Sequence, residues 1–499
     1  MAFIALQLVA SSGFAARNLA PELPGTDSRY ASGTPTRAEP SGPWWTSFED
    51  RELDALVDEA LQANHQLAVA VARAQQAQAV SVQSVSPLLP SASFDVGLNA
   101  SPSSSAAFQV PPQLTEALDE LTALGDQFGQ FTGEDDSEDE DAEAPDVTWG
   151  GSALVQLGLN IDLGRSAANL RASQLDAAAA RGDRDGVAHV ITQQVCSAWF
   201  DLRAARARVA VIEEQVRTNE SVLELTQMRY EAGDSRGLDV LQQQQQLAMT
   251  RALLPRAQQQ QRVFEVQLAV LLGRDPSAPG FAEVAAPEEG RALPDLPPQP
   301  GLGTPADLLE TRAEVVAARF RYDAARARVF ASALSFAPSF RLSANAGWSL
   351  RWYDEWSEQE TWGFGAAVSV PIFGGLQRHG ALRQATAARA AASREYSRAA
   401  LVARAEVESA LARETTGVDR LAALGDQLRA AGLAYDESTR QYAAGVVNYL
   451  TVLTSLASLQ SVQLEHLQAR RDVLAARIDL HAALGASGPG RAAATEVQP

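Results

Sequence analysis

The sequence predicts an α+β membrane protein in which one structural plan is written twice, and three observations support this. Landmarks recur in the same order in both halves, four segments alternate apolar and small polar residues, and the remaining runs have the composition of long packed helices. Of the 499 residues, 46% are hydrophobic but only 6% aromatic. That balance is typical of packed helices rather than of sheet sandwiches.

The internal repeat determines the order of the expected elements. The loop RYEAGDSRGLDVLQ matches QYAAGVVNYLTVLT, which aligns Gly233 with Gly445. Both halves close on a Leu-Gly pair, at 272–273 and 484–485, and the spacing between these pairs equals the spacing between the two loop glycines. Each half is therefore expected to contain a helix of about 35 residues, two short strands, a helix of about 67, a tight glycine loop and a returning helix of about 35.

The expected boundaries follow from these landmarks. The first repeat covers 48–272, with strands at about 91–100 and 151–163, a long helix at about 165–231 and a return helix at about 238–272. The second covers 304–485, with strands at about 339–349 and 361–371, a long helix at about 376–443 and a return helix at about 450–484. An export signal (1–16), an N-terminal extended segment (17–47), a Pro-rich linker (273–303) and a flexible tail (486–499) complete the chain. At about 1.5 Å per residue, each long helix would extend about 100 Å.

The strand segments are suited to a bilayer. Each has about the 9 to 11 residues that a tilted strand needs to cross the hydrocarbon core, with one apolar face and one small polar face. No run of 18 apolar residues occurs, so strands rather than helices are expected to cross. Tryptophans near the strand ends match the place of an interfacial aromatic belt; these are Trp149, Trp348, Trp352 and Trp362.

Four strands cannot close a conducting barrel. Open sheet edges are not tolerated in hydrocarbon, so several chains must combine their strands. Three chains give twelve strands, an even number within the usual range for such barrels. A trimer is the simplest count, although the residues alone leave other counts open.

The charge distribution and the motif content exclude several function classes. The formal net charge is -20, and the block EDDSEDEDAE at 134–143 lies in a long loop that is expected on the outer face. A basic footprint for nucleic acid is absent. The sequence has no phosphate loop and no His-Glu-x-x-His, and its five histidines lack ligand spacing. We therefore expect neither an enzyme nor a cofactor or metal site.

In its order of motifs the chain resembles the outer-membrane efflux protein family, the TolC-like channels, and particularly the nodulation-type members of resistance-nodulation-division efflux systems. The resemblance covers roughly 44–485 and rests on WWTSFEDRELDALVDEALQANHQLAVAVARAQQAQA, VPIFGG and QYAAGVVNYLTVL, together with the duplication. It implies a trimeric twelve-stranded barrel in the outer membrane, four strands per chain, continued by a periplasmic tunnel of antiparallel coiled-coil helices.

The same resemblance implies a function and its partners. The chain would be the exit duct of a tripartite efflux pump, passively conducting small molecules such as drugs or other toxic compounds from the periplasm to the exterior. A homotrimer in outer-membrane lipid would engage a periplasmic adaptor protein and an inner-membrane pump, expected to be proton-driven. One alternative is the exit channel of a type I protein-secretion system, and another is a soluble coiled-coil tether, because heptad-like spacing also suits an ordinary coiled coil.

Two sites are carried over from the family, residue by residue. The tip loops that would dock the adaptor contain Gly233, Asp234, Gly445 and Val446. In related channels the periplasmic gate is a leucine followed four residues later by an aspartate. Here Leu450 matches the leucine, Thr454 stands at the acid position, and Leu238 followed by Asp239 marks the first half. An apolar constriction is therefore expected, with the charged ring absent or moved to Asp239.

The beginning of the chain departs from the expected signal. The core from Ala2 to Ala10 is short and lacks preceding positive residues, so it is interpreted as an atypical or truncated export signal. Ser11 stands where a bacterial lipoprotein would have its lipid-accepting cysteine. Acylation of the chain as written is therefore not predicted.

Overall fold

The computed structural model describes Tyr30 and residues 43–102, 147–277, 293–352 and 356–485, except for the side chains of residues 100–102, 147–149, 352 and 356. The chain divides into two compact units. One is helical and comprises residues 1–82, 168–330 and 379–499; the other contains the strands and comprises residues 83–167 and 331–378. The predicted signal at 1–16, the acidic block at 134–143 and the tail at 486–499 lie outside the described residues.

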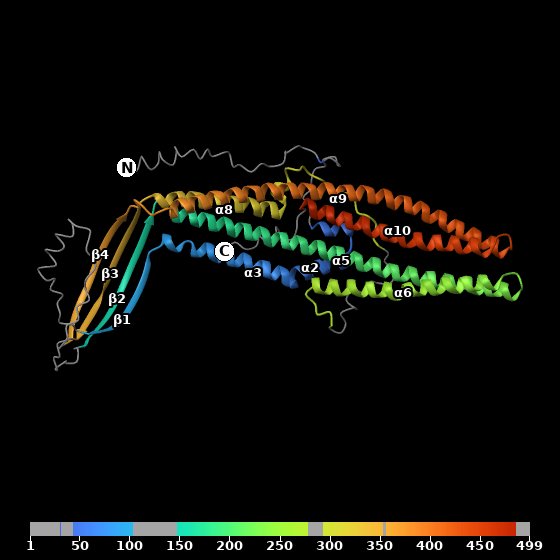
Figure 1. Ribbon diagram of the computed structural model, residues 1–499, viewed down its shortest axis with the longest axis horizontal. Helices are drawn as coiled ribbons and strands as arrows, with labels where there is room; N and C mark the ends of the chain where they lie inside the picture. The colour runs from blue at the N-terminus through green and yellow to red at the C-terminus, as the bar shows by residue number, and fades with distance from the viewer. Residues whose placement is uncertain (1–29, 31–42, 103–146, 278–292, 353–355, 486–499) are drawn as a thin grey trace, which may run out of the picture. The chain divides into compact units, whose positions relative to one another are not determined.

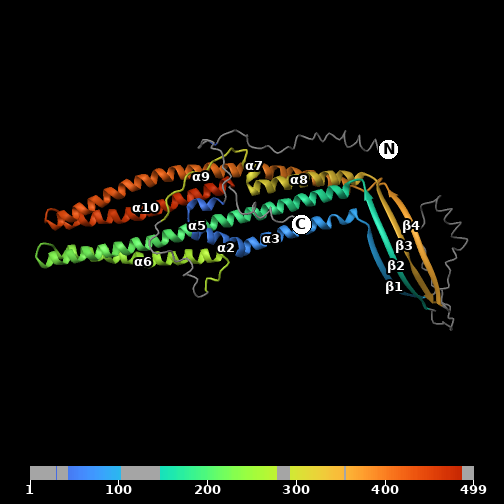
Figure 2. The ribbon, with the colours of Figure 1, turned by 180° about the vertical axis from the view of Figure 1, so that it is seen from behind.

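Two long hairpins form the helical unit (Figures 1 and 2). The first joins α5 (Arg165–Glu231) to α6 (Gly237–Leu271), and the second joins α9 (Gln377–Ala443) to α10 (Tyr449–Leu484). Both long helices have 67 residues. The spacing between the starts of α5 and α9 equals that between the starts of α6 and α10, so the repeated sequence folds into a repeated hairpin.

Shorter helices complete the unit. They are η1 (Trp44–Phe48), α2 (Arg51–Ala63), α3 (His65–Gln83), α7 (Leu308–Thr311) and α8 (Ala313–Ala333). The single opening helix expected in the first half is divided at Asn64, whose backbone is extended. Its side chain accepts from the backbone N–H groups of Gln66 and Leu67 at 2.8 and 3.2 Å. Asn64 is thus the N-cap of α3. Its extended backbone ends α2, and its side chain satisfies the first free N–H groups of α3.

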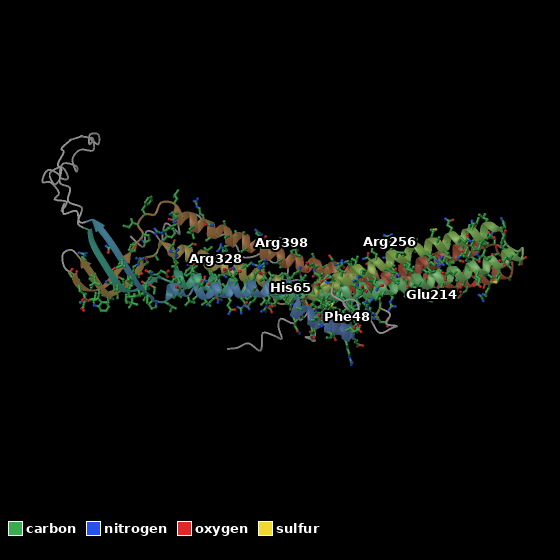
Figure 3. All side chains as sticks on the ribbon, turned by 90° about the horizontal axis from the view of Figure 1, so that it is seen from below. Phe48, His65, Glu214, Arg256, Arg328 and Arg398 are labelled. Atoms are coloured by element: carbon green, nitrogen blue, oxygen red, sulfur yellow. The ribbon has the colours of Figure 1, made fainter. Side chains whose placement is uncertain are left out.

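The largest core lies where η1 and α2 pack against α5 and α10. Phe48 of η1, labelled in Figure 3, belongs to this core. Its ring centroid lies 5.1 Å from that of Phe200 in α5. Asp50 caps α2 by accepting from the N–H groups of Glu52 and Leu53. The same buried carboxylate accepts from Trp199 Nε1 at 3.0 Å and from Arg203 at 2.7 Å. One side chain therefore starts a helix and pairs a buried cation.

The second described part of the Pro-rich linker, residues 293–303, contacts α10. Leu293 and Leu302 are buried in two different hydrophobic clusters. Arg470 of α10 donates to the backbone oxygen of Leu293 at 2.8 Å. Arg477 donates to the Glu414 carboxylate at 2.6 and 3.1 Å and also to the carbonyl of Pro297. The linker is held by buried hydrogen bonds as well as by apolar packing.

The strand unit is one antiparallel sheet in the order β1-β2-β3-β4. Its strands are β1 (Ser91–Pro102), β2 (Val147–Asp162), β3 (Ser339–Trp352) and β4 (Trp356–Ser369). The 3₁₀ turn η2 (Ser86–Leu88) precedes β1, and the 3₁₀ turn η4 (Leu334–Phe336) precedes β3. The register brings apolar positions of neighbouring strands together; for example, Phe340 pairs with Ile161 and Val368.

All four strands differ in extent from the prediction, and β1 ends two residues later, at Pro102. β2 begins four residues earlier and β3 ends three residues later, because backbone pairing continues beyond the apolar alternation that was used to find them. β4 begins five residues earlier and ends at Ser369 instead of 371. Pro371 has no N–H to donate and cannot continue the ladder. The extension places Glu360 opposite Trp348 and Glu358 opposite Leu350, on the apolar face.

None of the helices in the described ranges is both long enough and apolar enough to cross a membrane.

Candidate functional site

One face of the sheet presents large apolar side chains to the surroundings. Phe94, Leu98 and Phe364 are 67%, 87% and 76% exposed, which a water-facing sheet would not leave uncovered. Most of the residues that alternate with the apolar positions are small or polar, chiefly serine, asparagine, glutamine and glycine, and a few are charged, such as Asp95 and Arg341. The sheet therefore has one face suited to lipid and one suited to water.

The tryptophans predicted for an interfacial belt are only partly described. Trp348 and Trp362 lie on the apolar face and are 54% and 83% exposed. The backbones of Trp149 and Trp352 pair with each other at the hairpin end of the sheet, while their side chains lie outside the described residues. The exposure of Trp348 and Trp362 suits contact with lipid, but Trp362 is the seventh of the fourteen residues of β4, so the earlier start of this strand moves it away from the strand end at which the belt was predicted.

The two tip loops share one backbone conformation. Gly233 has φ +77° and Gly445 has φ +76°, a left-handed conformation that glycine adopts without steric cost. In the first loop the N–H of Asp234 donates to the Arg229 carbonyl at 2.9 Å. In the second loop the N–H of Val446 donates to the Gln441 carbonyl at the same distance. Both are Schellman-type helix ends, so the loops can be compared residue by residue.

The leucines carried over as gate residues lie immediately after the tip loops. Leu238 and Leu450 are each the second residue of their helix, and they are 58% and 55% exposed in the single chain. Thr454 is exposed, and its hydroxyl donates to the Thr451 carbonyl at 3.1 Å. The repeat thus presents two equivalent apolar side chains from two helix starts.

Asp239 has a local structural role. Its carboxylate accepts from the Ser235 hydroxyl at 2.9 Å and from the Arg236 N–H at 3.2 Å. A carboxylate in this position satisfies free donors at the start of α6 and interacts favourably with the helix dipole. The acid that follows Leu238 is therefore held as a helix cap.

An arginine joins the two hairpins near the tips. The guanidinium of Arg229, in the last turn of α5, donates to the Tyr442 carbonyl and, at 3.3 Å, to the Ala443 carbonyl. It also lies 4.6 Å above the centre of the Tyr442 ring. A cation of the first hairpin therefore caps the last turn of α9 in the second.

A buried polar network forms a second link between the hairpins. The hydroxyl of Tyr449 in α10 donates to Oε1 of Gln243 in α6 at 2.5 Å. Nε2 of Gln243 donates to the Asn219 carbonyl in α5 at 2.8 Å, and Nδ2 of Asn219 donates to Thr250 Oγ1 at 3.2 Å. All four side chains are buried. Separating the hairpins here would leave buried polar groups unpaired, which is costly.

Electrostatics keeps Tyr449 a hydrogen-bond donor. Burial, with smaller contributions from Tyr442 and Asp239, raises the pKa of Tyr449 well above its ordinary value. The hydroxyl is therefore protonated at neutral pH and donates to Gln243. A further layer begins at Gln215 of α5, whose Nε2 donates to the Gln460 carbonyl of α10 at 3.0 Å and to Gln463 Oε1 at 2.9 Å.

Comparison with known proteins identifies the family. The model of the outer membrane efflux protein family matches residues 56–274 and 304–486. The chain belongs to the outer membrane efflux protein family. Pyoverdine export outer membrane protein OpmQ of Pseudomonas aeruginosa is 30% identical over 466 residues, covering 92% of this chain and 90% of that protein. Its Pseudomonas putida counterpart is 29% identical over 460 residues, covering 91% of each.

Solved structures show the same fold. The outer-membrane channel OprN superposes with a TM-score of 0.77 at 22% identity, covering 92% of this chain and 96% of that one. VceC of Vibrio cholerae has a TM-score of 0.74 at 23% identity, covering 90% and 100%. The predicted family is confirmed, and so is a fold of long helices and a four-stranded antiparallel sheet in each chain. This member of the outer membrane efflux protein family is an exit channel in the outer membrane that extends into the periplasm.

Sequence reasoning missed the residues that join the hairpins of this efflux channel. Tyr449 and Gln243 are 206 residues apart, and no local pattern marks them as partners. The sequence did contain two indications of a polar contact near the tips. Tyr449 directly follows the second tip loop, and Gln243 lies in a run of glutamines that a purely apolar helix interface would not contain.

Proposed function

We propose that three copies of this chain form one channel that docks a periplasmic adaptor and is driven by an inner-membrane pump. The observation that supports this most directly is the antiparallel sheet, in which β1 and β4 are edge strands. Its exposed apolar face suits lipid, and an open sheet edge in lipid leaves several unsatisfied backbone groups. Pairing β4 of one chain with β1 of the next closes the edges, and three chains give an even-numbered barrel of about twelve strands.

The channel conducts passively and makes or breaks no bond. The energy for transport comes from the pump, for which a proton-driven type is expected. Small molecules are the proposed cargo. In support, two relatives are named for pyoverdine export, and another, over a shorter match, is named a probable efflux pump outer membrane protein, TtgC.

The gate is proposed at the two leucines that follow the tip loops. Leu238 and Leu450 are large apolar side chains exposed in the single chain at equivalent helix starts. Three copies would place six of them around the inner end of the tunnel. Such an apolar constriction excludes water and ions by dewetting. The Arg229 contact and the Tyr449–Gln243 bond would hold the hairpins in this closed arrangement.

Planar-bilayer conductance tests the gate. Leu450→Ser is expected to raise single-channel conductance, because a small hydroxyl removes the apolar barrier. Leu401→Ser is a matched control, since Leu401 is 57% exposed on α9 and lies many turns before the end of that helix at Ala443. Equal conductance in the unaltered channel and the Leu450 variant would move the constriction to another position.

Oligomeric state and export test the assembly. The purified chain in detergent should scatter light as a particle with three times the protein mass of one chain. Expressed with a periplasmic adaptor and an inner-membrane pump from the same organism, the channel should restore resistance to a toxic small molecule in a strain that lacks its own exit channel. A monomer recovered intact from the cytosol would refute the proposal.

A further inference from the structure

The two tip loops have the same backbone and different chemistry. Residues 231–236 of the first tip contain three charged side chains, Glu231, Asp234 and Arg236, and all are exposed or partly exposed. The corresponding residues 443–448 of the second tip contain none. The constant spacing of the repeat places Val446 at the position of Asp234. Both residues use their backbone N–H in the same helix-end hydrogen bond, so only the side chains differ.

The charged groups that flank the first tip, Arg229 and Asp239, are already engaged. Arg229 is bound to the end of α9, and Asp239 caps α6. The set of Glu231, Asp234 and Arg236 therefore determines what the first tip offers to a partner, with a formal charge of about -1 at neutral pH. The second tip offers Val446, which is 73% exposed, beside the two small residues Ala443 and Ala444.

We propose that the two tips make chemically different contacts with the adaptor. The α5–α6 tip contacts a cationic side chain of the adaptor through Asp234 and Glu231, and the α9–α10 tip contacts an apolar side chain through Val446. This inference rests on the proposed docking function and specifies its chemistry. Exposed ion pairs weaken as salt shortens the Debye length, whereas apolar burial does not. The salt dependence of docking therefore originates in one tip alone.

The shared backbone permits a reciprocal exchange. Asp234→Val gives the first tip the residue of the second, and Val446→Asp does the reverse. Neither variant changes a backbone hydrogen bond or a glycine. The double variant keeps the net charge and composition of the channel and exchanges only the places of the two side chains. It is the internal control for folding and for nonspecific charge effects.

Binding of a purified periplasmic adaptor from the same organism to the full-length, detergent-solubilised channel is measured at low, intermediate and high NaCl concentrations. Asp234→Val should weaken binding about two- to five-fold at low salt and flatten the salt dependence. Val446→Asp should weaken binding about ten-fold or more at every salt concentration. The double variant should show both defects. Leu433→Asp, at an exposed position on α9, should bind as the unaltered channel does.

The outcomes separate this inference from the function on which it rests. A double variant that binds like the unaltered channel would show that the tips are interchangeable and would overturn the division. Equal salt dependence in the two single variants would also overturn it, as would unchanged binding in all variants. An unaltered channel that does not bind the adaptor at any salt concentration would refute the docking itself.

Discussion

His481 makes the stability of this channel depend on pH. The imidazole lies near the end of α10, stacked on Trp44 with ring centroids 5.2 Å apart and an interplanar angle of 15°. Phe48 covers another side at 6.4 Å. Within the described part of the chain neither ring nitrogen has a hydrogen-bond partner, although both are buried. Burial, followed by the charge of Arg477, lowers the pKa of His481 to about 4.

The direction and size of the effect follow from linkage. The unfolded chain takes up this proton near pH 6.5, whereas the folded chain resists doing so until about pH 4. The contribution of the neutral ring to the free energy of unfolding is therefore fully present above pH 6.5 and is lost as the pH falls towards 4. A difference of about 2.5 pKa units corresponds to about 3 kcal/mol per chain.

His481→Phe removes the titration and keeps an aromatic ring against Trp44. Guanidinium unfolding, followed by the helical circular dichroism signal at pH 7, 5.5 and 4, should show the unaltered protein losing about 3 kcal/mol more than the variant. His65→Gln, at an exposed position on α3, is the control and should follow the unaltered protein. If the protein and the His481 variant lose the same stability, His481 is not the titrating group and the reasoning fails.

Three further predictions concern single sites. Asp50→Ala should destabilise the helical unit by about 3 to 5 kcal/mol in equilibrium unfolding, because Arg203 would remain buried without its carboxylate; Asp50→Asn, which retains an acceptor, should cost less. Gly273→Ala should lower the midpoint of thermal unfolding more than Gly233→Ala does. Both glycines have positive φ, but only a Cβ at 273 would meet a backbone oxygen, that of Ala63 at 2.5 Å. Equal shifts in the two variants would contradict this. Burial raises the pKa of the Cys196 thiol, so a thiol reagent should label it only after unfolding, and rapid labelling of the folded channel would refute its burial.

Local sequence was sufficient for the strands, the two long helices and the two return helices. It was insufficient for the limits of the strands and for the opening helix of each half, which is divided into α2 and α3 in the first half and into α7 and α8 in the second. Alternation identified the strands because a sheet with one face in lipid and one in water requires a period of two. It could not locate the start of β4, since Glu358 and Glu360 break the apolar pattern while the backbone continues to pair with β3. The end of β4 was also misplaced, at 371 instead of Ser369, although Pro371 cannot continue the ladder and was visible in the sequence.

The candidate site was predictable only in part, for a similar reason. Gly233 and Gly445 marked the loops, because a left-handed residue at a helix end is a local requirement. The equivalent places of Leu238 and Leu450 follow from the constant spacing between the two repeats. The use of Asp239 as a helix cap depends on a loop geometry that composition does not give.

The sequence by itself therefore determined the repeated plan, the strand faces, the tip turns and the family. These properties depend on residues near one another in the chain or on one constant spacing. The tertiary structure alone decided which polar groups join the hairpins: Arg229 with the end of α9, and Tyr449 with Gln243. Such pairs depend on how two long helices are rotated and shifted against each other. Packing of the whole unit sets that geometry, and no segment carries it alone.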